Sequence, residues 1–176
     1  MIELLVVVSI IGLLASVALV ALKTARERAL MVRIAADAHQ IQSQIELTRD
    51  TKGKVLGEII GNWCRACEFN LIAPVKNQPI PVAHNDADWV ELGFPGGAPR
   101  DAWGTPYLLD ANEGEPNYPC GRQDGVMSAG PNGIYEIQPV YFAIIPNPNQ
   151  VYSVPGYDDL IFFMTLFKCL NPEIPG

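Results

Sequence analysis

The sequence predicts an α+β protein, in which one long N-terminal helix packs on a small antiparallel β-sheet. Two observations predict this fold class. Residues 2–51 contain no proline and only one glycine, Gly12, so they are able to form a single helix. Strand-like runs of β-branched and aromatic residues, separated by turn signals, follow beyond residue 106. We therefore expect three parts: a hydrophobic helix over 1–22, an amphipathic continuation over 23–54, and a globular head over 55–176 that holds a loop region and the sheet.

The first part of the chain is an apolar segment. The nineteen residues from Leu4 to Leu22 contain no charged side chain, and Glu3 lies directly before them. A run of this length is long enough to cross a bilayer as a helix. A cleaved signal peptide is a poorer explanation, because its apolar region is typically about 7–15 residues and follows a basic stretch. A one-pass membrane anchor that carries an independent periplasmic enzyme is an alternative.

From Lys23 onward the helix becomes amphipathic. Apolar residues recur on one stripe at helical spacing: Ala25, Ala29, Val32, Ala36, Ile41 and Ile45. Charged residues occupy the other faces, as expected for a helix laid against a sheet. The helix is predicted to end at Thr51-Lys52-Gly53, where glycine supplies a left-handed cap and lysine lies in the last turn. One continuous helix of these residues is about 75 Å long at 1.5 Å per residue.

The head begins with an irregular connection. Residues 55–99 carry five prolines and the Gly96-Gly97 pair, which predict loops with short helical turns. Strands are predicted afterwards over five runs: 107–109, 125–128, 134–137, 140–144 and 160–164. Together these runs predict a small antiparallel sheet packed on the C-terminal half of the helix.

Charge is distributed unevenly along the chain. The net charge is −7, with +2 over residues 1–54 and −9 over residues 55–176. An acidic head argues against a nucleic-acid groove, which needs clustered basic residues, and suits divalent cations better. No catalytic arrangement is recognisable, because neither His39 nor His84 has a nucleophile beside it and no phosphate-binding glycine loop or HExxH motif occurs. We therefore do not expect an enzyme.

The N-terminal run resembles the signature of type IV pilins and of the pseudopilins of type II secretion. The residues that carry the resemblance combine a glutamate, an apolar run and a glycine: Met1-Ile2-Glu3-Leu4-Leu5-Val6-Val7-Val8-Ser9-Ile10-Ile11-Gly12-Leu13-Leu14-Ala15. Two features depart from the family pattern. No Phe-Thr pair or basic leader precedes Met1, so we expect the chain to be trimmed or its start to be assigned late. Val20 stands where the family often has a kinking proline, so we expect an unbroken helix.

The resemblance implies a precursor in the bacterial inner membrane, whose leader a prepilin peptidase removes before it methylates the new N-terminus. It also implies homo-oligomeric assembly, by pilus or secretion machinery, into an extracellular pilus or a periplasmic pseudopilus with the apolar helix in its core. The residues expected to act in assembly are Glu3, Leu4, Leu5, Val8, Ile11, Gly12 and Leu13.

Two interpretations of Glu3 stay open. The acid stabilises the positive end of the helix dipole by about 0.3–1 kcal/mol, or it neutralises the α-amino group of a neighbouring subunit inside the filament.

A second resemblance lies in the head. Three stretches are similar to successive elements of the major pseudopilins of type II secretion: Asp101-Ala102-Trp103-Gly104-Thr105-Pro106-Tyr107, Ser128-Ala129-Gly130-Pro131-Asn132-Gly133 and Tyr157-Asp158-Asp159-Leu160-Ile161. In that group this loop binds calcium, so the resemblance makes Asn132, Asp158 and Asp159 candidate Ca²⁺ ligands, with Ser128 beside them. The alternative is turn chemistry, in which Asn-Gly forms a left-handed turn and the acids cap a strand. Residues 134–156 exceed the family's loop, and extra sheet or a subunit contact is expected there.

Four cysteines remain, Cys64, Cys67, Cys120 and Cys169. An even number in an extracytoplasmic head favours two disulfides. Among the pairings that four cysteines allow, we expect Cys64–Cys67 and Cys120–Cys169, with the longer closure stabilising by about 2–4 kcal/mol. A redox-active CxxC and a four-thiolate zinc site are the alternatives. The first lacks a preceding apolar strand, and the second lacks another CxxC.

Overall fold

A long helix, α1 (Ile2–Lys52), opens the chain and is followed by short helices and a small sheet. The computed structural model describes residues 2–61, 64–65, 78–81, 85–114, 122–136, 151–153 and 158–164. Tertiary contacts divide the chain into two units, Met1–Ile34 and Ala35–Gly176. The predicted α+β class is confirmed by the combination of this helix with an antiparallel sheet.

Helix α1 ends where the sequence predicts. It is helical without a break to Lys52, because no proline interrupts it. Gly53 follows with a φ of +64°, the left-handed conformation that glycine adopts without a side-chain clash. The Lys54 N–H then donates to the Arg49 carbonyl at 3.3 Å, which satisfies one of the last free carbonyls of the helix.

The buried face of α1 differs in part from the predicted stripe. Ile41 and Ile45 are buried, as predicted, but four predicted members are exposed: Ala25, Ala29, Val32 and Ala36. In the part of α1 that belongs to the second unit, Ala38 is the third buried apolar residue. Ala36 lies about 200° around the helix from Ala38, so it is on another face. The other three belong to the first unit, Met1–Ile34, among whose described residues only Ile34 is buried.

Among the described residues, two short helices lie between α1 and the sheet in the sequence. They are α2 (Leu56–Ile60) and α4 (Asp86–Glu91), and they confirm the predicted short helical turns. Trp89 on α4 is fully buried, and its ring meets that of Phe94 edge-on with the centroids 5.2 Å apart. The Thr48 hydroxyl on α1 donates to the Leu92 carbonyl at 2.9 Å, so the segment after α4 is tied to α1.

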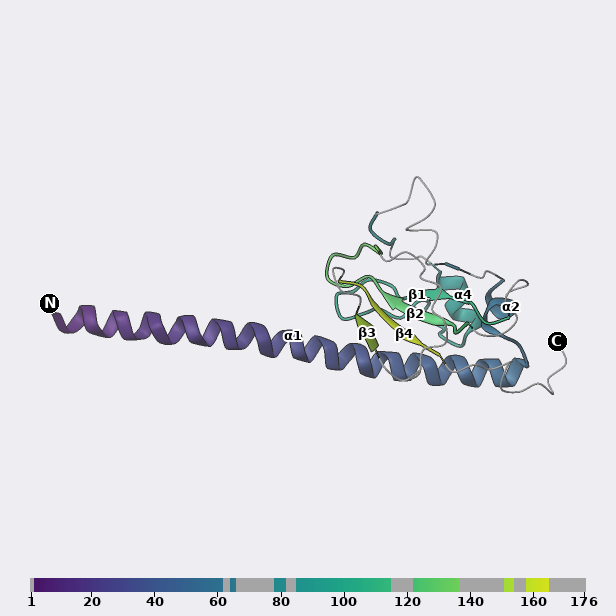
Figure 1. The fold of residues 1–176 in the computed structure, drawn as a ribbon, viewed down its shortest axis with the longest axis horizontal. Helices are drawn as coiled ribbons and strands as arrows, with labels where there is room; N and C mark the ends of the chain where they lie inside the picture. The colour runs from purple at the N-terminus through teal and green to yellow at the C-terminus, as the bar shows by residue number, and fades with distance from the viewer. Residues whose placement is uncertain are drawn as a thin grey trace. The chain divides into compact units, whose positions relative to one another are not determined.

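The sheet has four antiparallel strands (Figure 1). In the order in which they pair, they are β1 (Leu108–Asp110), β2 (Gly125–Ser128), β4 (Leu160–Phe163) and β3 (Val151–Ser153). Strands β1, β2 and β4 fall on predicted runs. Strand β3 lies within 134–156, the stretch for which extra sheet or a subunit contact is expected.

Alternate residues of the strands enter two hydrophobic cores. Leu109, Val126 and Phe162 stand in one cross-strand row and pack with Ala38, Ile41 and Ile45 of α1. Four apolar residues on the opposite face pack in the second core with Ile80 and Tyr135: Leu108, Met127, Ile161 and Phe163. Figure 1 shows the sheet alongside the C-terminal part of α1. The period-two alternation therefore places one face of the sheet on α1 and buries the other under loop residues.

One predicted strand, 134–137, is wrong over its described residues. Ile134 forms only an isolated bridge with Pro79, and Tyr135 and Glu136 belong to no strand. Proline has no N–H to donate, so a ladder does not extend through it. The predicted run 140–144 lies outside the described residues, as does Ile137.

Candidate functional site

The apolar N-terminal segment is the most unusual surface of the first unit. Every residue from Ile2 to Leu22 is exposed, and the large apolar side chains in this segment are each 52–78% exposed. The expected assembly residues Leu4, Leu5, Val8, Ile11 and Leu13 are among them, and a Cβ added at Gly12 would meet no atom within 4 Å. By length and composition α1 could cross a membrane, although a signal sequence passes the same test.

The polar side chains inside this segment are satisfied within the helix. The Ser9 hydroxyl donates to the Leu5 carbonyl at 2.8 Å, and the Ser16 hydroxyl donates to the Leu13 carbonyl at 2.7 Å. A hydroxyl that is bonded to its own helix needs no water, so it is tolerated in lipid or among other apolar helices. The segment therefore presents an apolar surface in all directions.

Glu3 lies in the first turn of α1 and is exposed. In this position a carboxylate interacts favourably with the positive end of the helix dipole, as the first interpretation requires. The second interpretation needs the N-terminus of another chain, and so it remains a prediction.

The element Asp101–Tyr107 forms a turn around the buried carboxylate of Asp101. Asp101 Oδ1 accepts the N–H groups of Trp103 and Thr105 at 3.0 and 2.9 Å, and its Oδ2 accepts the Ser128 hydroxyl at 2.6 Å. The turn closes with hydrogen bonds from the Asp101 N–H to the Thr105 carbonyl and from the Gly104 N–H to the Asp101 carbonyl. Burial raises the pKa of Asp101, and these hydrogen bonds oppose that rise.

Tyr107, at the end of the same element, joins the turn to the helix. Its side chain is fully buried, its ring meets Phe162 edge-on at 5.9 Å, and its hydroxyl donates to Asp37 Oδ2 on α1 at 3.3 Å. The element therefore positions the start of β1 against α1, which explains its chemistry without a ligand.

The three candidate calcium ligands lie in one loop region. Asp158 Oδ2 accepts the Asn132 N–H at 3.3 Å, and Asp159 Oδ2 accepts the Glu136 N–H at 2.8 Å. Asn132 Oδ1 accepts the Ile134 N–H at 2.6 Å, which is the hydrogen bond of an Asx turn. Ser128 donates to Asp101 rather than to any of the three.

One side-chain oxygen of each of the three residues therefore accepts a backbone N–H, the geometry expected of turn chemistry. Within the described ranges no group of three or more His, Cys, Asp or Glu side chains is arranged to hold a metal ion. Calcium binding through Asn132, Asp158 and Asp159 stays a prediction.

A buried charged cluster is the feature that sequence reasoning missed. The side chains of Arg49, Glu113 and Asp124 are all fully buried. Arg49 donates through Nη2 to Glu113 Oε2, and its Nη1 lies 3.8 Å from Asp124 Oδ2. One signal was present, because Arg49 lies four residues after Ile45 on the buried stripe of α1. Nothing in the sequence around the two acids indicates burial.

The cysteines are only partly within the described chain. Cys64 is in a disulfide. Its backbone also forms an isolated antiparallel β-bridge with Asp110 of β1. Its neighbour Arg65 holds Asp88 of α4 through Nε and Nη2 at 2.6 and 3.1 Å. Cys67, Cys120 and Cys169 lie outside the described residues, so both expected pairings stay predictions. His84 and Trp63 also lie outside them.

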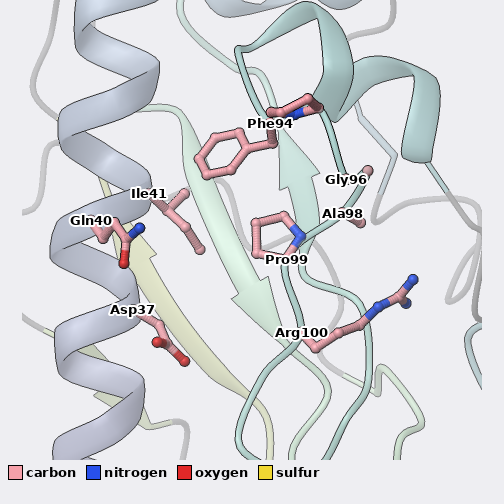
Figure 2. A pocket seen from close by; sticks show the side chains of 10 residues that line it. Asp37, Gln40, Ile41, Phe94, Gly96, Ala98, Pro99 and Arg100 are labelled. Atoms are coloured by element: carbon pink, nitrogen blue, oxygen red, sulfur yellow. The ribbon is translucent and has the colours of Figure 1, made fainter.

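A hollow of about 370 Å³ lies between α1 and residues 94–100. Figure 2 shows Phe94 and Pro99 directed toward Ile41, while the Arg100 guanidinium points away from the helix. The lining includes no Ser, Thr, Cys, His or Lys, and its charged side chains are Asp37 and Arg100. The hollow therefore lacks a hydroxyl or thiol nucleophile with a base beside it.

Comparison with models of protein families, with curated proteins and with solved structures gave no match. The function is therefore inferred from the residues and geometry described above.

Proposed function

We propose that this chain is a structural subunit, a pilin, of a type IV pilus-like helical filament that assembles through its N-terminal helix. The observation that supports this most strongly is the run Leu4–Leu22, which is helical, free of charge and exposed along its whole length. Apolar surface costs about 25 cal/mol per Å² when it stays in water. This run therefore needs lipid or other apolar helices around it.

Glu3 favours a filament over a simple anchor. A simple anchor gains only the helix-dipole interaction, about 0.3–1 kcal/mol, from a carboxylate at the mouth of its apolar segment, where a buried, unpaired charge is costly. In a bundle of identical helices the same carboxylate would neutralise the α-amino group of an adjacent chain and set the axial register. Lipid and helix bundle are both apolar, so transfer from one to the other is nearly balanced and an assembly machinery is able to drive it.

The pathway follows from this assignment. The subunit would wait in the bacterial inner membrane, be processed by prepilin peptidase, and then join a homo-oligomeric filament. An extracellular pilus is the first candidate. A periplasmic pseudopilus of type II secretion is the second, because the Asp101 turn and the order of the head motifs resemble the major pseudopilins. The acidic head serves as the structural outer part of either filament, with neither an enzymatic nor a nucleic-acid-binding role.

Replacement of Glu3 tests the proposal. In Glu3→Ala we expect normal folding of the head but a loss of filament yield greater than about tenfold, because one partner of a buried ion pair is removed. Filament yield is measured by quantifying the chain in sheared and sedimented material, and head folding by tryptophan fluorescence.

Glu27→Ala is the matched control. Glu27 is also an exposed acid on α1, and its contact with Lys23 is 3.9 Å long and solvated, so its removal should leave the yield unchanged. Equal yields from the wild type and Glu3→Ala would contradict the pairing. A chain that never polymerises would instead be a membrane-anchored binding protein.

A further inference from the structure

Three charged side chains are buried together where the end of α1 meets the sheet. Arg49 lies in the last turn of α1, Glu113 lies three residues beyond β1, and Asp124 directly precedes β2. Asp124 Oδ1 accepts the Glu113 N–H at 2.8 Å, and the Asp124 carbonyl accepts the Met164 N–H at 2.9 Å. The cluster therefore connects three elements of the second unit: α1, the connection between β1 and β2, and the end of β4.

The charges of this cluster do not balance when both acids are ionised. Arg49 is the single cation, and its hydrogen bond to Glu113 leaves Asp124 Oδ2 at 3.8 Å, beyond hydrogen-bond distance. Within the part of the chain that the structure describes, this buried oxygen has no hydrogen-bond partner. Asp110 on β1, itself buried, adds further negative charge nearby. A proton on Asp124 would balance the charges of Arg49, Glu113 and Asp124.

We propose that Arg49, Glu113 and Asp124 form a proton-dependent latch, which holds the C-terminal end of α1 on the sheet while Asp124 carries a proton and loosens when that proton is lost. Because the Arg49 side chain is fully buried, it cannot form hydrogen bonds with solvent instead when the charge of Asp124 changes. The latch would make the head less stable as the pH rises from about 5 to 7, and it would be fully engaged in acid.

The direction of the pH dependence follows from the environment of Asp124. Burial raises the pKa of Asp124 to about 7, while Arg49 and the Glu113 N–H oppose the rise and the charges of Glu113 and Asp110 add to it. In the unfolded chain an aspartic acid has a pKa of about 3.9. A group whose pKa is higher in the folded state stabilises fully below the unfolded value, and this stabilisation is lost as the pH rises through the folded value.

The test compares the full-length wild type with Asp124→Asn in detergent micelles. Urea unfolding is followed by tryptophan fluorescence between pH 5 and 8. We expect the ratio of the wild-type to the variant unfolding constant to rise by about tenfold per pH unit between about pH 5 and 7, and then to level off. Taking the ratio removes the contribution of Asp101, whose pKa is also raised by burial.

Asp50→Asn is the matched control, because Asp50 is the exposed neighbour of Arg49 on the same helix. Its ratio to the wild type should stay nearly constant over this pH range. A constant ratio for Asp124→Asn as well would overturn the proposal.

A second measurement keeps the test decisive if Asp124→Asn does not fold. In the wild type, the ¹³C shift of the Asp124 carboxyl carbon should titrate with a midpoint at about pH 7. A midpoint at about pH 4, the value of a solvated aspartic acid, would show that Asp124 is ionised at neutral pH and that no latch exists.

Discussion

Asp101 and Asp124 are both buried acids of the head, but their surroundings give them different consequences. Asp101 has hydrogen-bond donors for both carboxylate oxygens, so it organises a turn at little cost. Asp124 has one oxygen bonded to the Glu113 N–H and one without a hydrogen bond. Asp124 is assigned the pH-dependent role because its unsatisfied buried oxygen lies beside the Arg49–Glu113 pair, where loss of a proton leaves a net negative charge.

Gly130 tests how closely the head loops are packed. Its φ is +63°, and a Cβ built on it would overlap the backbone carbonyl oxygen of Asp158. The backbone cannot move aside as a flexible side chain does. Gly130→Ala should therefore destabilise the head by about 2–5 kcal/mol, through conformational strain and overpacking together. The free energy of unfolding from urea denaturation measures this loss.

Gly61→Ala is the control for backbone conformation alone. Gly61 has a similar φ, +68°, but a Cβ there would meet no atom within 4 Å. We expect a cost of about 1–2 kcal/mol. Equal losses from both variants would contradict the close approach of the Asp158 and Gly130 backbones.

The site residues that sequence reasoning identifies are those whose role is local. The Asp101 turn is readable because its donors lie two and four residues further along the chain. The acids Glu113 and Asp124 were not predicted, because their burial depends on the connection that brings them to Arg49. Arg49 alone carried a signal, a charge on an apolar stripe.

At the scale of elements, α1 has two environments along its length. Its residues from Ile2 to Leu22 are all exposed, whereas Ala38, Ile41 and Ile45 pack in a core with one face of the sheet. The same helix thus presents an exposed apolar surface near its N-terminus and is a structural member of the core in the second unit.

Truncation of one residue in each part separates these environments. Ile45→Ala should lower the free energy of unfolding of the head by about 2–5 kcal/mol, because it leaves a cavity between α1 and the sheet. Val32→Ala removes a side chain that is 70% exposed, and should change the value by less than about 0.5 kcal/mol. Urea denaturation in micelles measures both, and a large effect of Val32→Ala with a small effect of Ile45→Ala would contradict the observed packing.

The sequence predicts those elements whose pattern is long or clearly bounded. Helix α1 was predicted to within one residue at its C-terminal end, because Thr51-Lys52-Gly53 is a strong stop signal. Strand β3 is not one of the five predicted runs, because Val151–Ser153 is too short to show an alternation, although it lies in the stretch where extra sheet or a subunit contact is expected. The run from Ile134 looked like a strand, but its only pairing partner among the described residues is Pro79, which ends a ladder.

On the scale of the whole chain, the composition supports the proposed function. A net charge of −9 over residues 55–176 keeps a head soluble, whereas the uncharged run Leu4–Leu22 is insoluble unless it is covered. Polymerisation of the apolar helices, with the heads left in water, reconciles these two properties in one assembly. This is the central claim of the proposed function.

Electron microscopy of material sheared from cells that produce this chain, with identification by mass spectrometry, tests that claim most directly. The proposed assembly predicts filaments made of this chain, with Leu4–Leu22 of neighbouring copies in contact at the centre and Glu3 beside the N-terminus of an adjacent subunit. The contradictory result is a chain that stays in the cell envelope as a monomer, with no filament in the sheared fraction and no cross-link between copies through residues 4–22.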